Sequence, residues 1–169
     1  MNSECLRHPM SAQSKQPTYF EFEADFVAAL RCIPMQVRYN LDSCGIKLKL
    51  EHWNHFSPDQ KQALAESPCQ SASEVTAYGD RLQAWVTAQT GSSAKTLAID
   101  PEPAWLNGNV VPEVVLAKAE DCGLAIAPQQ WLEHWAGLSP LQRFALIKLS
   151  RPSHENRNFL PAMQEFGLV

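Results

Sequence analysis

The stretch from Pro34 to Leu48, PMQVRYNLDSCGIKL, is followed 78 residues later by a similar stretch, PEVVLAKAEDCGLAI, from Pro112 to Ile126. Proline, valine, cysteine and glycine fall at the same offsets in both. A proline suits the first turn of a helix, because its φ angle is already helical and its missing N–H needs no partner there. A glycine suits the residue after a helix, because it adopts the left-handed conformation without steric cost. Each stretch therefore predicts a helix that ends at its cysteine and glycine.

A second pair of matching segments follows the two predicted helices. WNHFSPDQKQAL begins at Trp53, and WAGLSPLQRFAL begins 82 residues later at Trp135. The change of offset from 78 to 82 is close to one helical turn, which a helix absorbs while it keeps the same face inward. In each segment the Ser-Pro pair predicts the N-cap and first residue of a further helix. We predict an all-α fold of two tandem modules, an internal repeat with about three helices each, packed as one compact helical domain.

The rest of the chain sets the predicted boundaries of these modules. Residues 1–17 are polar and read as a disordered arm, and residues 18–89 form the first helical module. This module closes with an amphipathic helix from Glu74 to Gln89. Residues 90–109 are rich in Gly, Ser, Pro and Asn and predict a linker, so that residues 110–169 form the second module.

Two local expectations concern aromatic residues. Alternating apolar residues from Tyr19 to Phe22 predict an extended entry into a short helix. Trp105, in the predicted linker, is expected to be an exposed anchor. The other four tryptophans have the spacing of core residues on helices: Trp53, Trp85, Trp131 and Trp135.

Composition excludes several classes of function. Charged residues make up 19% of the chain and the formal net charge is -4, so no global basic field attracts nucleic acid. No apolar run approaches a membrane span or the core of a signal peptide. The five cysteines include neither a CxxC pair nor a compact disulfide framework. We expect no nucleic-acid partner, no membrane partner and a cytoplasmic location.

Catalytic motifs are absent from the sequence. Glycine-rich phosphate loops, the G-x-S-x-G nucleophile turn and the H-E-x-x-H zinc motif do not occur. The sequence therefore predicts no catalytic residues, no cofactor and no enzyme. The alternative is a small helical module that binds a metal or acts as a thiol-redox protein, with candidate ligands Cys44, His52, His55 and Cys69.

A cluster of charged residues lies in an otherwise acidic chain. Its members are Arg31, Arg38, Asp42, Lys47 and Lys49. Such a cluster is either a docking patch for an acidic partner surface or a solvated face of mixed charge. We predict these five residues as the partner-binding site.

The segment from Tyr19 to Cys69 resembles the family of nitrate-reductase-associated proteins, small proteins of nitrate-assimilating bacteria, notably cyanobacteria. The resemblance rests on Phe20, Phe22, Asp25, Phe26, Leu30 to Met35, Val37, Arg38, Leu41, Asp42 and Gly45 to Leu48. It implies a non-catalytic accessory or maturation factor for assimilatory nitrate reductase, acting by protein–protein binding. The implied partner is nitrate reductase or the machinery that delivers and inserts its molybdenum cofactor.

Overall fold

The computed structural model describes residues 19–152 and 157–169, and these residues are mostly helical. The predicted arm of residues 1–17 lies outside this range. In chain order the elements are η1 (Glu21–Glu23), α1 (Ala24–Val27), α2 (Met35–Cys44), β1 (Ile46–Lys47), α3 (Leu50–His55), α4 (Pro58–Glu66), α5 (Ala72–Thr90), β2 (Lys95–Thr96), η2 (Ala104–Leu106), α6 (Glu113–Asp121), α7 (Pro128–Gly137), α8 (Pro140–Ser150) and α9 (Phe159–Glu165). The prediction of a helical fold is confirmed, with one small sheet added by β1 and β2.

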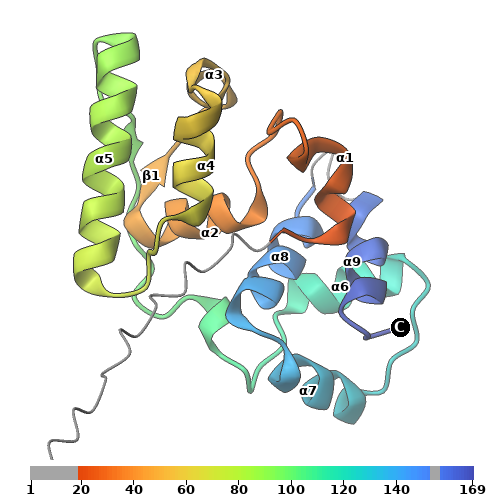
Figure 1. Ribbon diagram of the computed structural model, residues 1–169. Coiled ribbons are helices and arrows are strands. Elements are labelled where there is room, and N and C mark those ends of the chain that lie inside the picture. Colours follow the sequence, from red (N-terminus) through yellow and green to blue (C-terminus); the bar gives the residue numbers. More distant parts are fainter. Residues whose placement is uncertain (1–18, 153–156) are drawn as a thin grey trace, which may run out of the picture.

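Two hydrophobic cores lie side by side, and α2 runs between them (Figure 1). Helices α3 to α5 surround one core, and helices α6 to α9 surround the other. Val37 and Leu41 of α2 are buried in the first core, whereas Met35 is buried in the second. Helix α2 accordingly contacts both α5 and α8.

The expected start and stop signals shape α2 and its counterpart α6. Pro34 and Pro112 are the N-cap residues, one position before the first helical residue, with φ near -62° in both. Gly45 follows α2 with φ 65°, and Gly123 follows α6 with φ 75°. A side chain at such positive φ angles is strained, which explains why glycine stops each helix.

Capping boxes begin α4 and α8, as the Ser-Pro pairs predict. The Ser57 side chain accepts a hydrogen bond from the Gln60 backbone N–H at 3.2 Å, and Ser139 accepts one from Gln142 at 3.2 Å. The two glutamine side chains accept the serine backbone N–H in return. These reciprocal bonds satisfy helix-end donors and fix where each helix starts.

The segment predicted as a linker carries structure of its own. Strand β2 pairs antiparallel with β1, so that Ile46 lies opposite Thr96 and Lys47 opposite Lys95. Ala94, just before β2, is buried in the first core. The segment is therefore packed against the first half of the chain before it crosses to the second.

The expectation that Trp105 is an exposed anchor is wrong. Its ring is partly buried against the second core, 5.1 Å from the Phe144 ring and 6.1 Å from the Tyr39 ring. The partners come from α2 and α8, far from Trp105 in sequence, so local composition could not reveal them. The other predicted core tryptophans are buried, except Trp85, which is partly buried.

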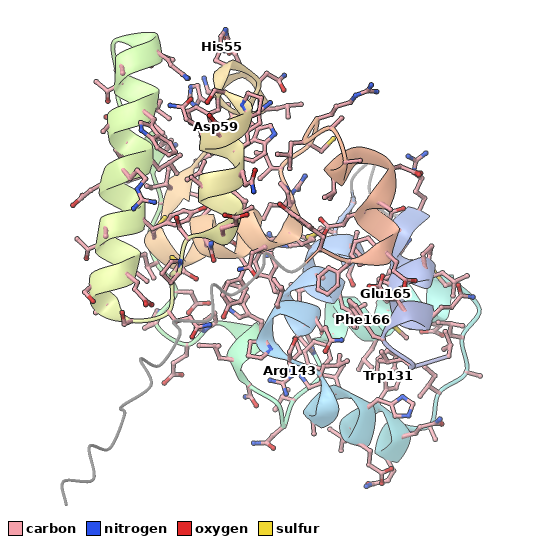
Figure 2. The ribbon with its side chains drawn as sticks, viewed as in Figure 1. His55, Asp59, Trp131, Arg143, Glu165 and Phe166 are labelled. Atoms are coloured by element: carbon pink, nitrogen blue, oxygen red, sulfur yellow. The ribbon has the colours of Figure 1, made fainter. Side chains whose placement is uncertain are left out.

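The beginning of the described chain packs on its end. Residues 19–20 are extended, and the 3-10 turn η1 follows them. The Glu165 carboxylate of α9 accepts the backbone N–H groups of Glu21 and Phe22 at 2.9 and 3.2 Å. The Phe20 ring lies 5.0 Å from the Phe166 ring, at the junction that Figure 2 labels by Glu165 and Phe166.

A buried carboxylate fixes the N-terminus of α2. Glu23 is 1% exposed, and its two oxygens accept the backbone N–H groups of Phe20 at 3.2 Å and Met35 at 2.7 Å. A negative charge at a helix N-terminus is stabilised by the helix dipole and by the unpaired N–H groups there.

The Glu23→Ala variant tests this contact. We expect the free energy of unfolding to fall by about 2 to 4 kcal/mol, because two buried N–H groups lose their acceptor. Urea denaturation followed by circular dichroism measures it. The exposed Glu21 supplies the matched control, and Glu21→Ala should change stability by less than about 0.5 kcal/mol. Equal effects of the two substitutions would contradict the assignment.

Candidate functional site

A groove of about 280 Å³ lies where α2 and β1 of the first half face α8 of the second. We call it the first groove. Its lining residues are Cys32, Ile33, Arg38, Leu41, Asp42, Ile46, Lys47, Leu48, Leu50, Leu97 and Lys148. Its floor is apolar, and its charged side chains come from α2, β1 and α8.

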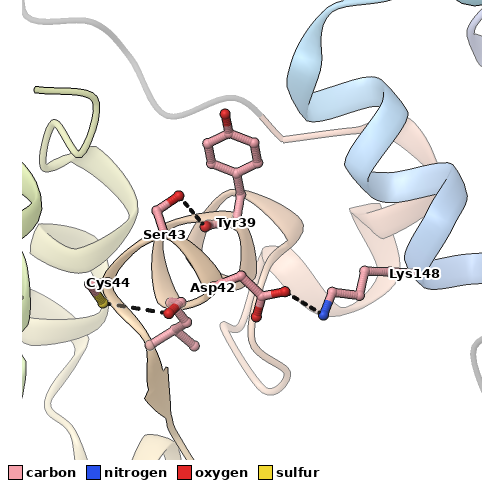
Figure 3. Close-up of polar contacts among 6 residues, drawn as sticks. Tyr39, Asp42, Ser43, Cys44 and Lys148 are labelled. Atoms are coloured by element: carbon pink, nitrogen blue, oxygen red, sulfur yellow. Dashed lines mark hydrogen bonds and ion pairs between the residues drawn. The ribbon is translucent and has the colours of Figure 1, made fainter. Parts of the chain in front are cut away.

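Three cations and one carboxylate set the charge of the first groove. The Lys148 ammonium lies 2.7 Å from an Asp42 carboxylate oxygen, and the two side chains are 19% and 31% exposed (Figure 3). Lys148 also lies over the Phe144 ring, 5.1 Å from its centroid. The lining side chains thus carry three formal positive charges, on Arg38, Lys47 and Lys148, and one formal negative charge, on Asp42. Such a site is suited to an acidic group or segment.

A hydrogen bond to the backbone just before α2 holds the Arg38 side chain in place. Its Nε donates a hydrogen bond to the Ile33 carbonyl oxygen at 2.9 Å. This bond turns the guanidinium back over the residues that precede α2 and satisfies a carbonyl next to the helix start. The guanidinium therefore has a structural contact and also lines the groove.

The structure brings three of the five predicted partner-binding residues together. Arg38, Asp42 and Lys47 line the first groove, whereas Arg31 and Lys49 are exposed and do not line it. The spacing of Arg38 and Asp42, four residues apart on α2, places them on one helix face. Lys47 joins them because Gly45 turns the chain back along α2.

Sequence reasoning missed Lys148 as a member of the site. The residue lies in α8, 106 positions after Asp42, and no local pattern links the two. Lys148 follows an apolar run of α8 that packs in the second core, and that run gives no indication of where the ammonium lies. Only the packing of α8 against α2 places its ammonium at the groove.

The two cysteines of the alternative metal or redox site, Cys44 and Cys69, pack in the first core, close enough for their thiols to interact electrostatically. Burial raises the pKa of the Cys44 thiol to about 11 and that of the Cys69 thiol to about 12. Since the thiolate is the metal ligand and nucleophile, both groups are in the unreactive form at neutral pH. The Cys44 thiol points to the Leu41 carbonyl oxygen (Figure 3), 3.6 Å away.

The two histidines are occupied by contacts within α3. His52 Nδ1 accepts the Lys49 backbone N–H at 3.4 Å, and His55 Nδ1 lies 2.7 Å from the Glu51 carbonyl oxygen. His55 lies at the outer end of the first half (Figure 2). In the described part of the chain, no group of three or more His, Cys, Asp or Glu side chains is placed to hold a metal ion.

The raised thiol pKa values predict how stability depends on pH. The folded state keeps both protons at a pH where an unfolded cysteine, with a pKa of about 8.5, loses its own. The contribution is therefore complete below about pH 8 and shrinks as pH rises toward the folded pKa values. We expect the free energy of unfolding, measured in urea with reductant, to fall between about pH 8 and 9.5, below the titration of ordinary tyrosines.

The double variant Cys44→Ala/Cys69→Ala is the control for this pH dependence. It lacks both buried thiols, so its free energy of unfolding should decline less over the same pH interval. An identical decline in the wild type and the double variant would show that other groups cause it.

The fold and the first groove define a small helical protein with a charged surface groove. The chain belongs to the family described as conserved nitrate reductase-associated protein, whose model matches residues 19–166. Neither curated proteins nor solved structures yield a match to the chain. No helix of the described residues combines the length and apolar character needed to cross a membrane.

Proposed function

We propose that this protein is a non-catalytic accessory or maturation factor for assimilatory nitrate reductase, and that the first groove is its contact surface. The partner is the reductase or the machinery that delivers its molybdenum cofactor. Family membership over residues 19–166 supports the link to nitrate reductase. The observation that carries the contact surface is the gathering of Arg38, Lys47 and Lys148 around one groove.

The charge of the first groove stands out against the rest of the chain. The formal net charge is -4, yet three cations meet one carboxylate at this place. A local positive site on an acidic protein orients an approaching partner and disfavours contact elsewhere on the surface. The groove also exposes Leu50 and Leu97, at 51% and 47%, which provide apolar area beside the charges. An acidic segment with apolar flanks fits this combination.

We also infer that the two halves arose by duplication of one helical module, with residues 18–89 and 110–169 as the copies and residues 90–109 as the connection. Matching contacts support the inference. Trp53 Nε1 donates to the Leu30 carbonyl oxygen at 2.8 Å, and Trp135 Nε1 donates to the Asn107 carbonyl oxygen at 2.9 Å. Each indole thus binds the backbone of the segment that enters its own half.

The cations above these tryptophans match as well. Lys61 lies over the Trp53 ring at 5.6 Å, and Arg143, 82 residues later, lies over the Trp135 ring at 6.0 Å. Both cations are the ninth residue of their matching segments, WNHFSPDQKQAL and WAGLSPLQRFAL. Similar folds of unrelated origin would not be expected to agree in such side-chain detail.

A host that lacks this gene tests the proposed function. We expect the reductase polypeptide to accumulate with reduced activity and reduced molybdenum content, and the wild-type gene to restore both. Lys47→Glu should fail to restore them, because it reverses an exposed charge of the first groove. Reductase activity, reductase molybdenum and the level of this protein are measured in each strain.

Lys118→Glu is the matched control, because Lys118 lies on α6 outside the first groove. It should restore activity as the wild type does. Unchanged activity and molybdenum after deletion would refute the accessory role. Equal behaviour of the two lysine variants, with the role intact, would refute the first groove as its contact surface.

A further inference from the structure

A larger groove, of about 660 Å³, lies on the second half between α6, α7 and the segments that precede them. We call it the second groove. It is lined by Asn109, Val110, Val111, Leu116, Ala119, Glu120, Leu124, Ala125, Ile126, Pro128, Trp131 and Leu132. Leu116 and Leu132 are 38% and 43% exposed, so the groove presents apolar side chains at the surface.

The second groove occupies the place in its half that the first groove occupies in the other. Nine residues that line the second groove match nine residues that line the first. Eight of the matched pairs are 78 positions apart in the sequence, and the ninth, Leu50 with Leu132, is 82 positions apart. These are the offsets of the two matching sequence segments. If the halves are copies, the grooves are two versions of one site.

In the first half, the chain itself covers part of this site. Strand β2 pairs with β1, and the Leu97 backbone N–H donates to the Gly45 carbonyl oxygen at 2.8 Å. A Cβ atom on Gly45 would lie 2.6 Å from the Leu97 carbonyl oxygen and 2.8 Å from Ile99 Cγ1. The segment from Lys95 to Ile99 thus lies directly on Gly45, and its Leu97 side chain lines the groove.

At the equivalent place in the second half, residues 19–152 and 157–169 provide no such cover. A Cβ atom on Gly123 would meet nothing within 4 Å. The backbone from Leu124 to Ala127 has no regular secondary structure. Among the described residues, no backbone or side-chain hydrogen bond reaches the N–H or carbonyl groups of Ala125 and Ile126. An uncovered edge beside an apolar groove is a template for strand pairing.

The chemistry of the two grooves differs at two matched positions. Leu116 stands where the first groove has Arg38, and Ala125 stands where it has Lys47. Trp131 adds a buried aromatic wall. The cations are therefore replaced by apolar groups, so the occupant of the second groove presents apolar side chains rather than carboxylates.

We propose that the second groove binds an extended segment of a partner protein, with apolar side chains at alternate positions, that pairs antiparallel with Leu124–Ala125. One backbone N–H of the segment donates to the Gly123 carbonyl oxygen, as Leu97 does to Gly45. Main-chain bonds of this kind give affinity, and the groove selects the alternate side chains. The inference rests on the proposed duplication and is independent of which partner supplies the segment.

The covering segment of the first half provides the probe. A labelled peptide of residues 93–101, SAKTLAIDP, is titrated with the intact protein and followed by fluorescence anisotropy. The tethered copy of this sequence holds the first groove at a high effective concentration, which leaves the second groove for the free peptide. We expect saturable binding, weakened about ten-fold or more by Leu116→Glu, which places a carboxylate on the apolar wall at a position where neither groove has one.

Val114→Glu is the matched control, because Val114 is 49% exposed on the same helix and does not line the second groove. It should change the affinity by less than about two-fold. A peptide with Leu97→Pro lacks the required N–H and should bind about ten-fold more weakly. Should Leu116→Glu lower the unfolding midpoint, the exposed Ala125→Glu replaces it.

Several results would overturn the proposal. They are the absence of saturation at millimolar peptide, equal loss of affinity in Leu116→Glu and Val114→Glu, and equal binding of the proline peptide. A dimer in sedimentation that only Leu116→Glu dissociates would identify a second copy of the chain as the occupant and would also overturn it. The titration contains no reductase, so its failure is distinct from failure of the proposed accessory role.

Discussion

The structure depends on the placement of α2 between two hydrophobic cores. A helix of ten residues cannot hold two cores together unless its ends are fixed, because any rotation would withdraw Met35 from one core or Val37 and Leu41 from the other. The buried Glu23 carboxylate fixes one end by accepting the Met35 backbone N–H, and the left-handed Gly45 fixes the other. Arg38 and Asp42 lie on α2 between these two contacts, so the contacts set the direction in which both side chains face.

The same helix joins the halves through charge as well as through packing. The Asp42–Lys148 ion pair crosses from α2 to α8, and both side chains retain contact with solvent. A partly exposed pair of this kind adds little to stability, so its effect is mainly on the local potential. The Asp42–Lys148 pair stands beside Arg38 and Lys47 in the lining of the first groove. The interface between α2 and α8 therefore sets both the packing of the two halves and the position of the charged groups in the first groove.

The two grooves show how one local framework yields two different surfaces. The caps, the tryptophan hydrogen bonds and the cation above each tryptophan agree between the halves, and none of these tryptophans and cations lines either groove. The walls differ, with Arg38 and Lys47 in one place and Leu116 and Ala125 in the other. The covering segment differs too, since Leu97 and Ile99 lie over Gly45 while Gly123 is open. Framework residues preserve the fold, and wall residues are free to change what each groove accepts.

The sequence by itself determined the helices, their caps and much of the core. Those features depend on contacts within a few residues, such as the Ser57–Gln60 box or the glycine after α2, so local pattern was sufficient. It also placed Arg38, Asp42 and Lys47 among the predicted partner-binding residues, since all three lie in one short segment. Only the tertiary structure decided that Lys148 completes the first groove, that Trp105 packs on Tyr39 and Phe144, and that β2 covers Gly45. Each of these contacts joins residues distant in sequence, and their pairing is set by how the two cores pack around α2 rather than by any local periodicity.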